Sequence, residues 1–129
     1  MVPHMTTQAK RSRNNQTGAF GEAMVGAFVE KRGDEILDRN WRVREGEIDI
    51  VTLGADGFFH FIEVKTRSSL AFGHPFEAIN RDKAHRMQRL ALAWLATHRA
   101  LGCDYQIDIA AVLIAPDGTF TLEYCGALL

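Results

Sequence analysis

Apolar and polar residues recur with two different periods along the chain, and these periods predict a mixed α/β domain. From Thr17 to Arg32 the apolar side chains follow helical spacing, and Gly33 supplies a stop. A short helical turn is expected over residues 76–79, and Asn80 is a suitable N-cap for a long helix over 81–100. Strands are expected over residues 36–43, 47–53, 58–65, 104–115 and 119–124.

The order of these elements, α-βββ-α-ββ, indicates an α/β fold with a mixed five-stranded sheet flanked by helices. The Gly54–Gly57 segment is a turn signal, so residues 47–65 should form a hairpin. A chain of 129 residues has room for one domain, which we place at 17–129. Residues 1–16 are polar and basic, and we expect them to form a flexible tail.

The expected third strand carries charged residues where burial should exclude them. Side chains alternate between the two faces of a strand, so Glu63 and Lys65 share a face with Phe61, while His60 and Ile62 share the other. Both faces are mostly apolar, which is typical of a central strand that is covered on both sides. A buried carboxylate and a buried ammonium cost several kcal/mol unless they are paired, hydrated or bound to a metal.

The second strand places another carboxylate near the same position. A hairpin would bring Asp49 close to Glu63, and two adjacent carboxylates repel each other. A divalent cation would relieve this repulsion, and oxygen ligands favour Mg²⁺ or Mn²⁺. Lys65 would point at the same site, where it could orient or deprotonate a water and stabilise charge on a phosphate.

At this point the sequence resembles a known family. The segments Gly21-Glu22, Arg39-Asn40, Gly46–Val51 and Phe61–Arg67, together with Lys83, are similar to the YraN family of uncharacterised bacterial proteins. That family carries the D…ExK signature of the restriction-endonuclease-like superfamily and is similar to archaeal Holliday-junction resolvases. The resemblance covers about residues 17–125 and implies a restriction-endonuclease-like fold.

The resemblance also implies roles for individual residues. Asp49, Glu63 and the Val64 backbone carbonyl would be ligands of Mg²⁺ or Mn²⁺, and Lys65 would be the catalytic lysine. Glu22 would be an outer carboxylate supplied by the first helix, acting as a catalytic group and reaching the metal through water.

Structural interpretations stand beside these roles. Lys65 could simply pair with Glu63 or Asp49, because structural ion pairs also perturb pKa values. Glu22 could be an ordinary exposed helix residue. Glu47 lies on the same strand face as Asp49, and it could either support the metal ligands or form a salt bridge of its own.

Basic residues on the second long helix are candidates for nucleic-acid contacts. Arg81, His85 and Arg89 are spaced along one helix face, Lys83 lies nearby, and Arg67 ends the third strand. The default alternative is a solvated charged face. The net charge of −1 differs from that of a dedicated DNA-coating protein, so any binding should depend on local patches and on salt.

These features predict a metal-dependent nuclease that hydrolyses phosphodiester bonds of DNA, with branched or structured DNA as a candidate substrate. The alternative is a nucleic-acid-binding module that keeps the nuclease-like fold and does not cut. The sequence contains no apolar run of about 18 residues, so no membrane span is expected, and the absence of a signal peptide predicts a cytoplasmic protein. By analogy with other proteins of this fold, the chain could form a homodimer.

Overall fold

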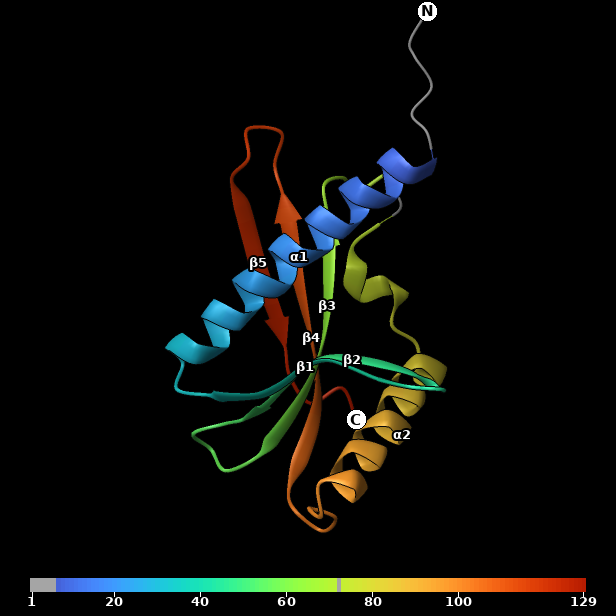
Figure 1. The fold of residues 1–129 in the computed structure, drawn as a ribbon. Helices are drawn as coiled ribbons and strands as arrows, with labels where there is room; N and C mark the ends of the chain where they lie inside the picture. The colour runs from blue at the N-terminus through green and yellow to red at the C-terminus, as the bar shows by residue number, and fades with distance from the viewer. Residues whose placement is uncertain (1–6, 72) are drawn as a thin grey trace, which may run out of the picture.

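The computed structural model describes residues 7–71 and 73–129, and the elements follow the predicted order. Within these residues, two α-helices and a short 3₁₀ helix accompany five strands (Figure 1). Their bounds are α1 Thr7–Lys31, β1 Glu35–Val43, β2 Gly46–Leu53, β3 Phe59–Arg67, η1 Pro75–Ala78, α2 Arg81–Thr97, β4 Tyr105–Ile114 and β5 Phe120–Cys125.

The five strands form one mixed sheet in the order β1-β2-β3-β4-β5. Neighbouring strands are antiparallel except β3 and β4, which are parallel and are connected through η1 and α2. A parallel pair needs such a crossover, because its second strand must restart at the same end of the sheet. The predicted hairpin is confirmed, since β2 and β3 pair in antiparallel register from Leu53–Phe59 to Ile50–Ile62.

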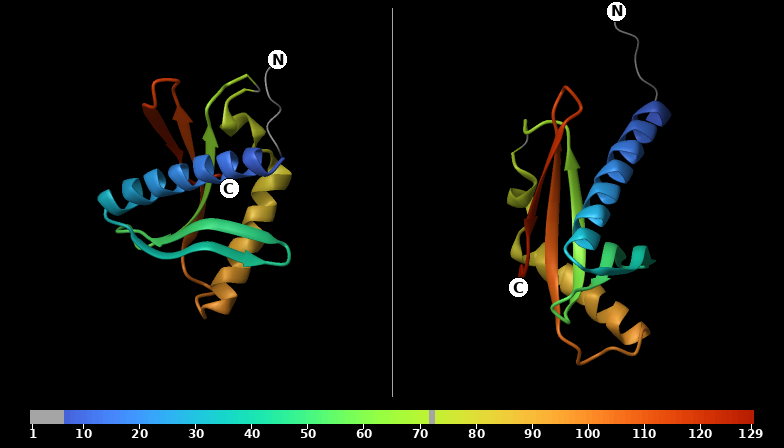
Figure 2. Two further views of the ribbon diagram at one scale, coloured as in Figure 1. Left: turned by 45° about the horizontal axis from the view of Figure 1, so that its top comes forward. Right: turned by 90° about the vertical axis from the view of Figure 1, so that its left-hand side faces the viewer.

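The sheet is covered on both faces, and β3 contributes to both cores. Successive β3 residues point to opposite cores. Phe61 packs with the α2 residues Trp94 and Leu95, whereas Ile62 packs with the α1 residues Val25 and Val29. Figure 2 shows α1 lying across the sheet, with η1 on the opposite side. This arrangement confirms that the third strand is a central strand buried on two sides.

Helix α1 begins earlier than expected. Residues 7–16, which we assigned to a flexible tail, lie in α1, and residues 1–6 lie outside the described part of the chain. The segment is polar and lacks an apolar stripe, so its sequence gives no signal of helical periodicity. Among the described residues, no helix is long and apolar enough to cross a membrane.

Helix α2 begins as predicted, because the Asn80 side chain accepts a hydrogen bond from the backbone N–H of Lys83 at 2.9 Å. Its inner face is apolar. Ala84, Ala91, Trp94 and Leu95 are buried, and Met87 is half-buried against the same core. The helix is thereby packed against β2, β3 and β4, and this packing sets where the residues that flank its apolar stripe lie along the sheet.

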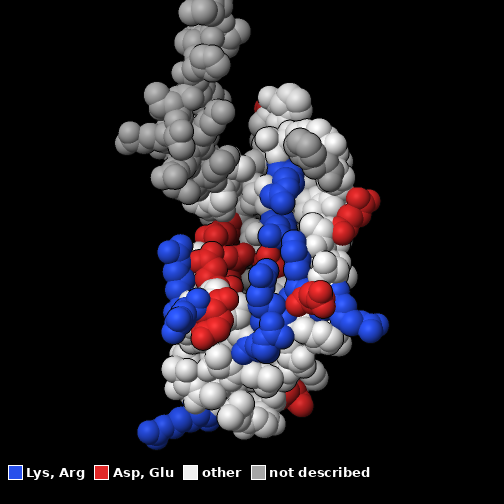
Figure 3. Space-filling model, turned by 90° about the vertical axis from the view of Figure 1, so that its right-hand side faces the viewer, with Lys and Arg blue, Asp and Glu red and all other residues white. Residues whose placement is uncertain are grey.

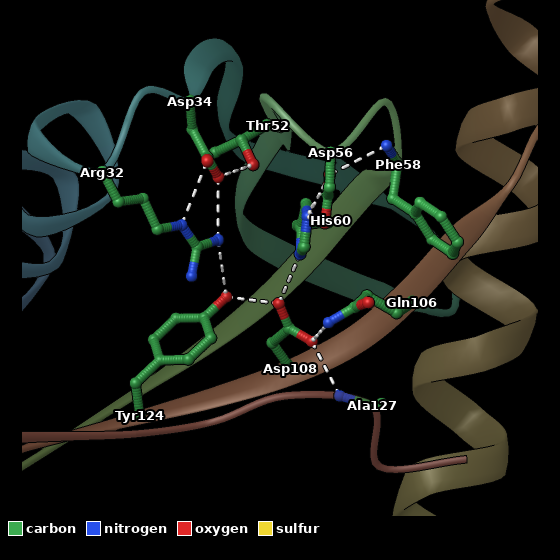
Figure 4. Close-up of polar contacts among 10 residues, drawn as sticks. All are labelled: Arg32, Asp34, Thr52, Asp56, Phe58, His60, Gln106, Asp108, Tyr124 and Ala127. Carbon is green, nitrogen blue, oxygen red and sulfur yellow. Dashed lines mark hydrogen bonds and ion pairs between the residues drawn. The ribbon is translucent and has the colours of Figure 1, made fainter.

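A buried polar network, drawn in Figure 4, includes His60 of β3. By strand alternation His60 shares the α1-facing side of β3 with Ile62, and Glu63 and Lys65 point to the other side. Asp108 is its centre: its carboxylate pairs with His60 Nδ1 at 2.7 Å and accepts hydrogen bonds from Gln106, from Tyr124 and from the backbone of Ala127. No buried side-chain nitrogen or oxygen within the described ranges lacks a partner. The network therefore stabilises the β3–β4–β5 region, and His60 packs away from Glu63 as the alternation predicts.

Candidate active site

The candidate site lies where the ladder between β2 and β3 ends. The last paired residues are Ile50 and Ile62, and continuing that register by one residue places Asp49 opposite Glu63. Beyond the ladder, the Asp49 side chain accepts a hydrogen bond from the backbone N–H of Val64 at 2.7 Å. This contact fixes the Asp49 carboxylate beside the Glu63–Lys65 segment.

A pocket of about 490 Å³ opens at this position, and we call it the acidic pocket. Parts of α1, the β1–β2 turn, β2, β3 and α2 form its walls. Five carboxylates and two cations line it: Glu22, Glu45, Glu47, Asp49, Glu63, Lys65 and Arg86. Figure 3 shows acidic side chains gathered beside lysine and arginine side chains on the face that carries α2. The pocket therefore brings together every charged side chain to which the sequence assigned chemistry at the metal.

The pKa of Asp49 is raised to about 7, and burial is the largest cause. The carboxylates of Glu22, Glu47 and Glu63 contribute to this rise, whereas the hydrogen bond from Val64 opposes it. Loss of hydration and like-charge repulsion both disfavour the ionised form, while a backbone donor favours it. Near neutral pH, Asp49 is therefore poised between a protonated state and an ionised state that calls for a compensating cation.

Glu63 and Lys65 form an ion pair, with Lys65 Nζ 2.8 Å from Glu63 Oε1. About a quarter of each side chain is exposed, so the pair is partly desolvated but open to the pocket. This is the pairing that a purely structural interpretation requires. It also keeps the ammonium beside Glu63 in the pocket that Asp49 lines.

Glu22 reaches the pocket because α1 packs unusually close to β3. A Cβ atom at Gly21 would lie 1.8 Å from Thr66 Oγ1, so a larger residue here would force the Thr66 side chain or the helix to move. The next residue along the helix, Glu22, then lines the pocket together with Asp49 and Glu63. Glu22 is thus half-buried at the pocket and is not an ordinary exposed helix residue, while its chemical role stays a prediction.

The donor atoms suit a hard divalent cation, since the candidate ligands are carboxylate and carbonyl oxygens. Within residues 7–71 and 73–129, however, no three His, Cys, Asp or Glu side chains converge closely enough to form a ligand cluster by themselves. Backbone oxygen and water would therefore have to complete the coordination. This is compatible with Mg²⁺, which usually retains several waters and uses one or two carboxylates.

Glu47 lines the acidic pocket and is also paired outside it, with its Oε2 2.7 Å from Arg42 Nε. The salt bridge that was one of the two interpretations is therefore present, and support of the metal ligands by Glu47 stays a prediction. The salt bridge is exposed and contributes little stability. The main effect of Glu47 at the site is electrostatic, because it is one of the carboxylates that raise the pKa of Asp49.

The basic residues predicted on α2 do not line the acidic pocket. Arg81, His85 and Arg89 are exposed, Lys83 is half-buried, and none of them contributes to the pocket wall. Arg67 is exposed at the end of β3, where it borders a neighbouring pocket. A role for these residues in binding nucleic acid stays a prediction.

Two charged residues of the pocket, Glu45 and Arg86, were not among the predicted site residues. Arg86 precedes Met87 on α2, at the edge of the buried stripe, so its position follows once that stripe is docked on the sheet. Glu45 belongs to the turn between β1 and β2, and no motif in its sequence distinguishes it. Both residues reach the site through tertiary packing, which the local pattern does not encode.

Comparison with known proteins gives a consistent set of relatives. The model of a family described as "Uncharacterised protein family UPF0102" matches residues 21–112. The UPF0102 protein of Beutenbergia cavernae is 47% identical over 107 residues, covering 83% of this chain and 90% of the relative. The UPF0102 protein of Trichlorobacter lovleyi is 40% identical over 111 residues, covering 86% and 87%.

Among solved structures, one similar chain comes from the crystal structure of a repair endonuclease from Pyrococcus abyssi. The TM-score is 0.37 and the sequence identity is 16%. The match covers 90% of this chain and 40% of the Pyrococcus chain.

Proposed function

The chain belongs to the UPF0102 (YraN) family, and we propose that it is a metal-dependent nuclease that hydrolyses phosphodiester bonds of DNA, with branched or structured DNA as the first substrate class to test. One observation carries this proposal: Asp49, Glu63 and Lys65, the residues of the D…ExK signature, line one pocket at the end of the β2–β3 ladder. The mixed sheet with the strand order β1-β2-β3-β4-β5 agrees with the restriction-endonuclease-like architecture that the motif leads us to expect.

In this proposal Asp49, Glu63 and the Val64 carbonyl hold Mg²⁺ or Mn²⁺, and Glu22 contributes through water. A bound ion of this kind lowers the pKa of a coordinated water and stabilises charge on a phosphate oxygen. The raised pKa of Asp49 supports the assignment, because it reports a cluster of oxygen ligands whose repulsion a cation would relieve. Deprotonation of Asp49 and cation binding should therefore be coupled.

Lys65 acts on the phosphate and on the attacking water. Its ammonium lies 2.8 Å from Glu63, so exchanging part of this pairing for a phosphate oxygen requires only a local side-chain movement. A preorganised positive charge at this position stabilises the charge that develops as the phosphodiester is attacked. Lys65 could also orient the water through one of its remaining N–H donors.

The test is a cleavage assay on linear, nicked, flapped and four-way DNA, with Mg²⁺ or Mn²⁺ and with EDTA. Wild-type protein should cut at least one of these substrates only when metal is present. Asp49→Ala and Lys65→Ala should each lose about a hundredfold or more in rate, while Lys31→Ala, which removes an exposed charge at the end of α1, should cut normally. Equal cutting by all three variants would refute the proposal.

A second candidate function is a nucleic-acid-binding module that does not cut. The observation that favours it is the Glu63–Lys65 ion pair, in which each group already satisfies the other without metal or substrate. Such a module should bind DNA with strong salt dependence and should show no cleavage, in wild type or in Lys65→Ala. Lys65→Ala should also leave its response to metal unchanged. The same assay, read beside a binding titration, separates the two functions.

A further inference from the structure

A second pocket adjoins the acidic pocket, and its lining has different chemistry. Its volume is about 510 Å³, and it shares Glu22, Val64 and Lys65 with the acidic pocket. The two pockets therefore adjoin each other near the end of β3. The second pocket continues along β3 to Arg67 and into the loop that follows it.

Hydroxyl groups surround this second pocket, which we call the hydroxyl pocket. They belong to Thr17, Thr66, Ser68 and Ser69. The Ser69 hydroxyl oxygen accepts a hydrogen bond from the backbone N–H of Ala71 at 3.1 Å, which leaves its O–H free to donate. Hydroxyl donors are common partners of phosphate oxygens in protein–nucleic acid contacts.

The charge balance differs sharply between the two pockets. The acidic pocket has five carboxylates against two cations, so it attracts a cation and repels a bare phosphate. The hydroxyl pocket has two cations, Lys65 and Arg67, against the single carboxylate of Glu22. Because Lys65 is already paired with Glu63, Arg67 is the cation that would attract an anion to the hydroxyl pocket before any metal binds in its neighbour.

Arg67 is available to bind such an anion. One guanidinium nitrogen donates to the backbone carbonyl of Thr66 at 3.0 Å, and across the described ranges Arg67 forms no ion pair with a carboxylate. The side chain is exposed, and its planar fork of donors matches two phosphate oxygens. Thus a cation and several hydroxyl donors surround one cavity beside the proposed reaction site.

We infer that the hydroxyl pocket binds a phosphate group of the nucleic-acid strand, one that neighbours the phosphate at which the acidic pocket acts. The identity of the ligand as nucleic acid rests on the proposed function, whereas the preference for a phosphate rests on the lining alone. Lys65 borders both pockets, so it lies between the two phosphates. The strand backbone would then run along β3 from Arg67 towards the acidic pocket.

The test uses single-stranded DNA of about eight nucleotides with a fluorescent label, titrated by anisotropy in EDTA so that binding needs no metal and no cutting occurs. Arg67→Ala should weaken binding by about tenfold and reduce the slope of log K against log salt by about 0.7. Ser68→Ala should weaken binding by a smaller factor. Lys31→Ala removes the same charge at a remote exposed position and should have neither effect.

A set of oligonucleotides, each with one neutral methylphosphonate linkage, then locates the contact. In a double-mutant cycle, the penalty of Arg67→Ala should disappear when one particular phosphate is neutral and persist for the others. A further oligonucleotide with a terminal phosphate shows whether that phosphate is internal or lies at the strand end.

Several outcomes would overturn the inference: an equal penalty at every position, a penalty no larger than that of Lys31→Ala, or no binding by wild-type protein at low salt. Cleavage is scored separately through Lys65→Ala. A protein that cuts without a local Arg67 contact refutes only the phosphate pocket. A protein with that contact that never cuts refutes only the nuclease proposal.

Discussion

Replacing Asp49 by asparagine should stabilise the metal-free protein at about pH 8, although it removes a proposed metal ligand. Burial and three neighbouring carboxylates raise the pKa of Asp49 from its ordinary value of 3.8 to about 7. A raised pKa means that the folded chain holds this proton more tightly than the unfolded chain. The associated stability is complete below pH 3.8 and is lost as the pH rises through about 7.

The size of the effect follows from the same two values. The difference between 3.8 and about 7 corresponds to a penalty on the order of 4 kcal/mol for ionised Asp49 above neutral pH. Asparagine avoids this penalty and can still accept the hydrogen bond from Val64, with a loss of about 1 kcal/mol because the acceptor is uncharged. The expected net gain at about pH 8 is therefore about 2–3 kcal/mol.

Urea unfolding followed by tryptophan fluorescence, in EDTA and at several values between about pH 5 and pH 8, measures this effect. Wild-type stability should fall relative to Asp49→Asn as the pH rises. Asp104→Asn provides a matched control, because Asp104 is exposed and does not line the pocket. If Asp49→Asn is no more stable than wild type at about pH 8, the electrostatic account of the pocket is wrong.

Three further outcomes are expected. Mg²⁺ should raise the thermal unfolding temperature of wild type more at about pH 8 than at about pH 5.5, because protons compete with the metal for Asp49. In Asp49→Asn the rise caused by Mg²⁺ should be much smaller. An equal rise of the wild-type unfolding temperature at both pH values would contradict this. Gly21→Ala should destabilise the fold by about 1–3 kcal/mol, since its Cβ would meet Thr66 Oγ1, and adding Thr66→Ala should recover part of the loss in urea unfolding. Asp108→Asn should cost about 3 kcal/mol in the same assay, because one amide group cannot accept the hydrogen bonds of every donor around that carboxylate; a neutral result would show that the network is not structurally required.

The convergence of Asp49 and Glu63 could be predicted because it depends on short-range rules. Alternation along a strand and a turn at Gly54–Gly57 are enough to form the hairpin, and the observed register, continued by one residue, pairs these two carboxylates. The sequence also identified the N-cap of α2 at Asn80. Each of these features depends on neighbours within a few residues or within one hairpin.

The remaining features depend on packing between distant segments. The hydrogen bonds that surround Asp108 come from β3, β4, β5 and the C-terminal segment, and the β3–β4 register that aligns them follows a long crossover rather than a turn. Arg86 enters the acidic pocket only once α2 has docked on the sheet. The start of α1 at Thr7 could not be predicted, because the first residues of the helix show no apolar periodicity.

Single-turnover cleavage with excess protein is the most direct test of the claim that the acidic pocket is a nuclease site. The substrate is whichever DNA structure wild-type protein cuts fastest in Mn²⁺. The account predicts that Lys65→Ala retains its fold by urea unfolding and binds the DNA, yet cuts it about a hundredfold more slowly or less. Cutting by Lys65→Ala at the wild-type rate would contradict it.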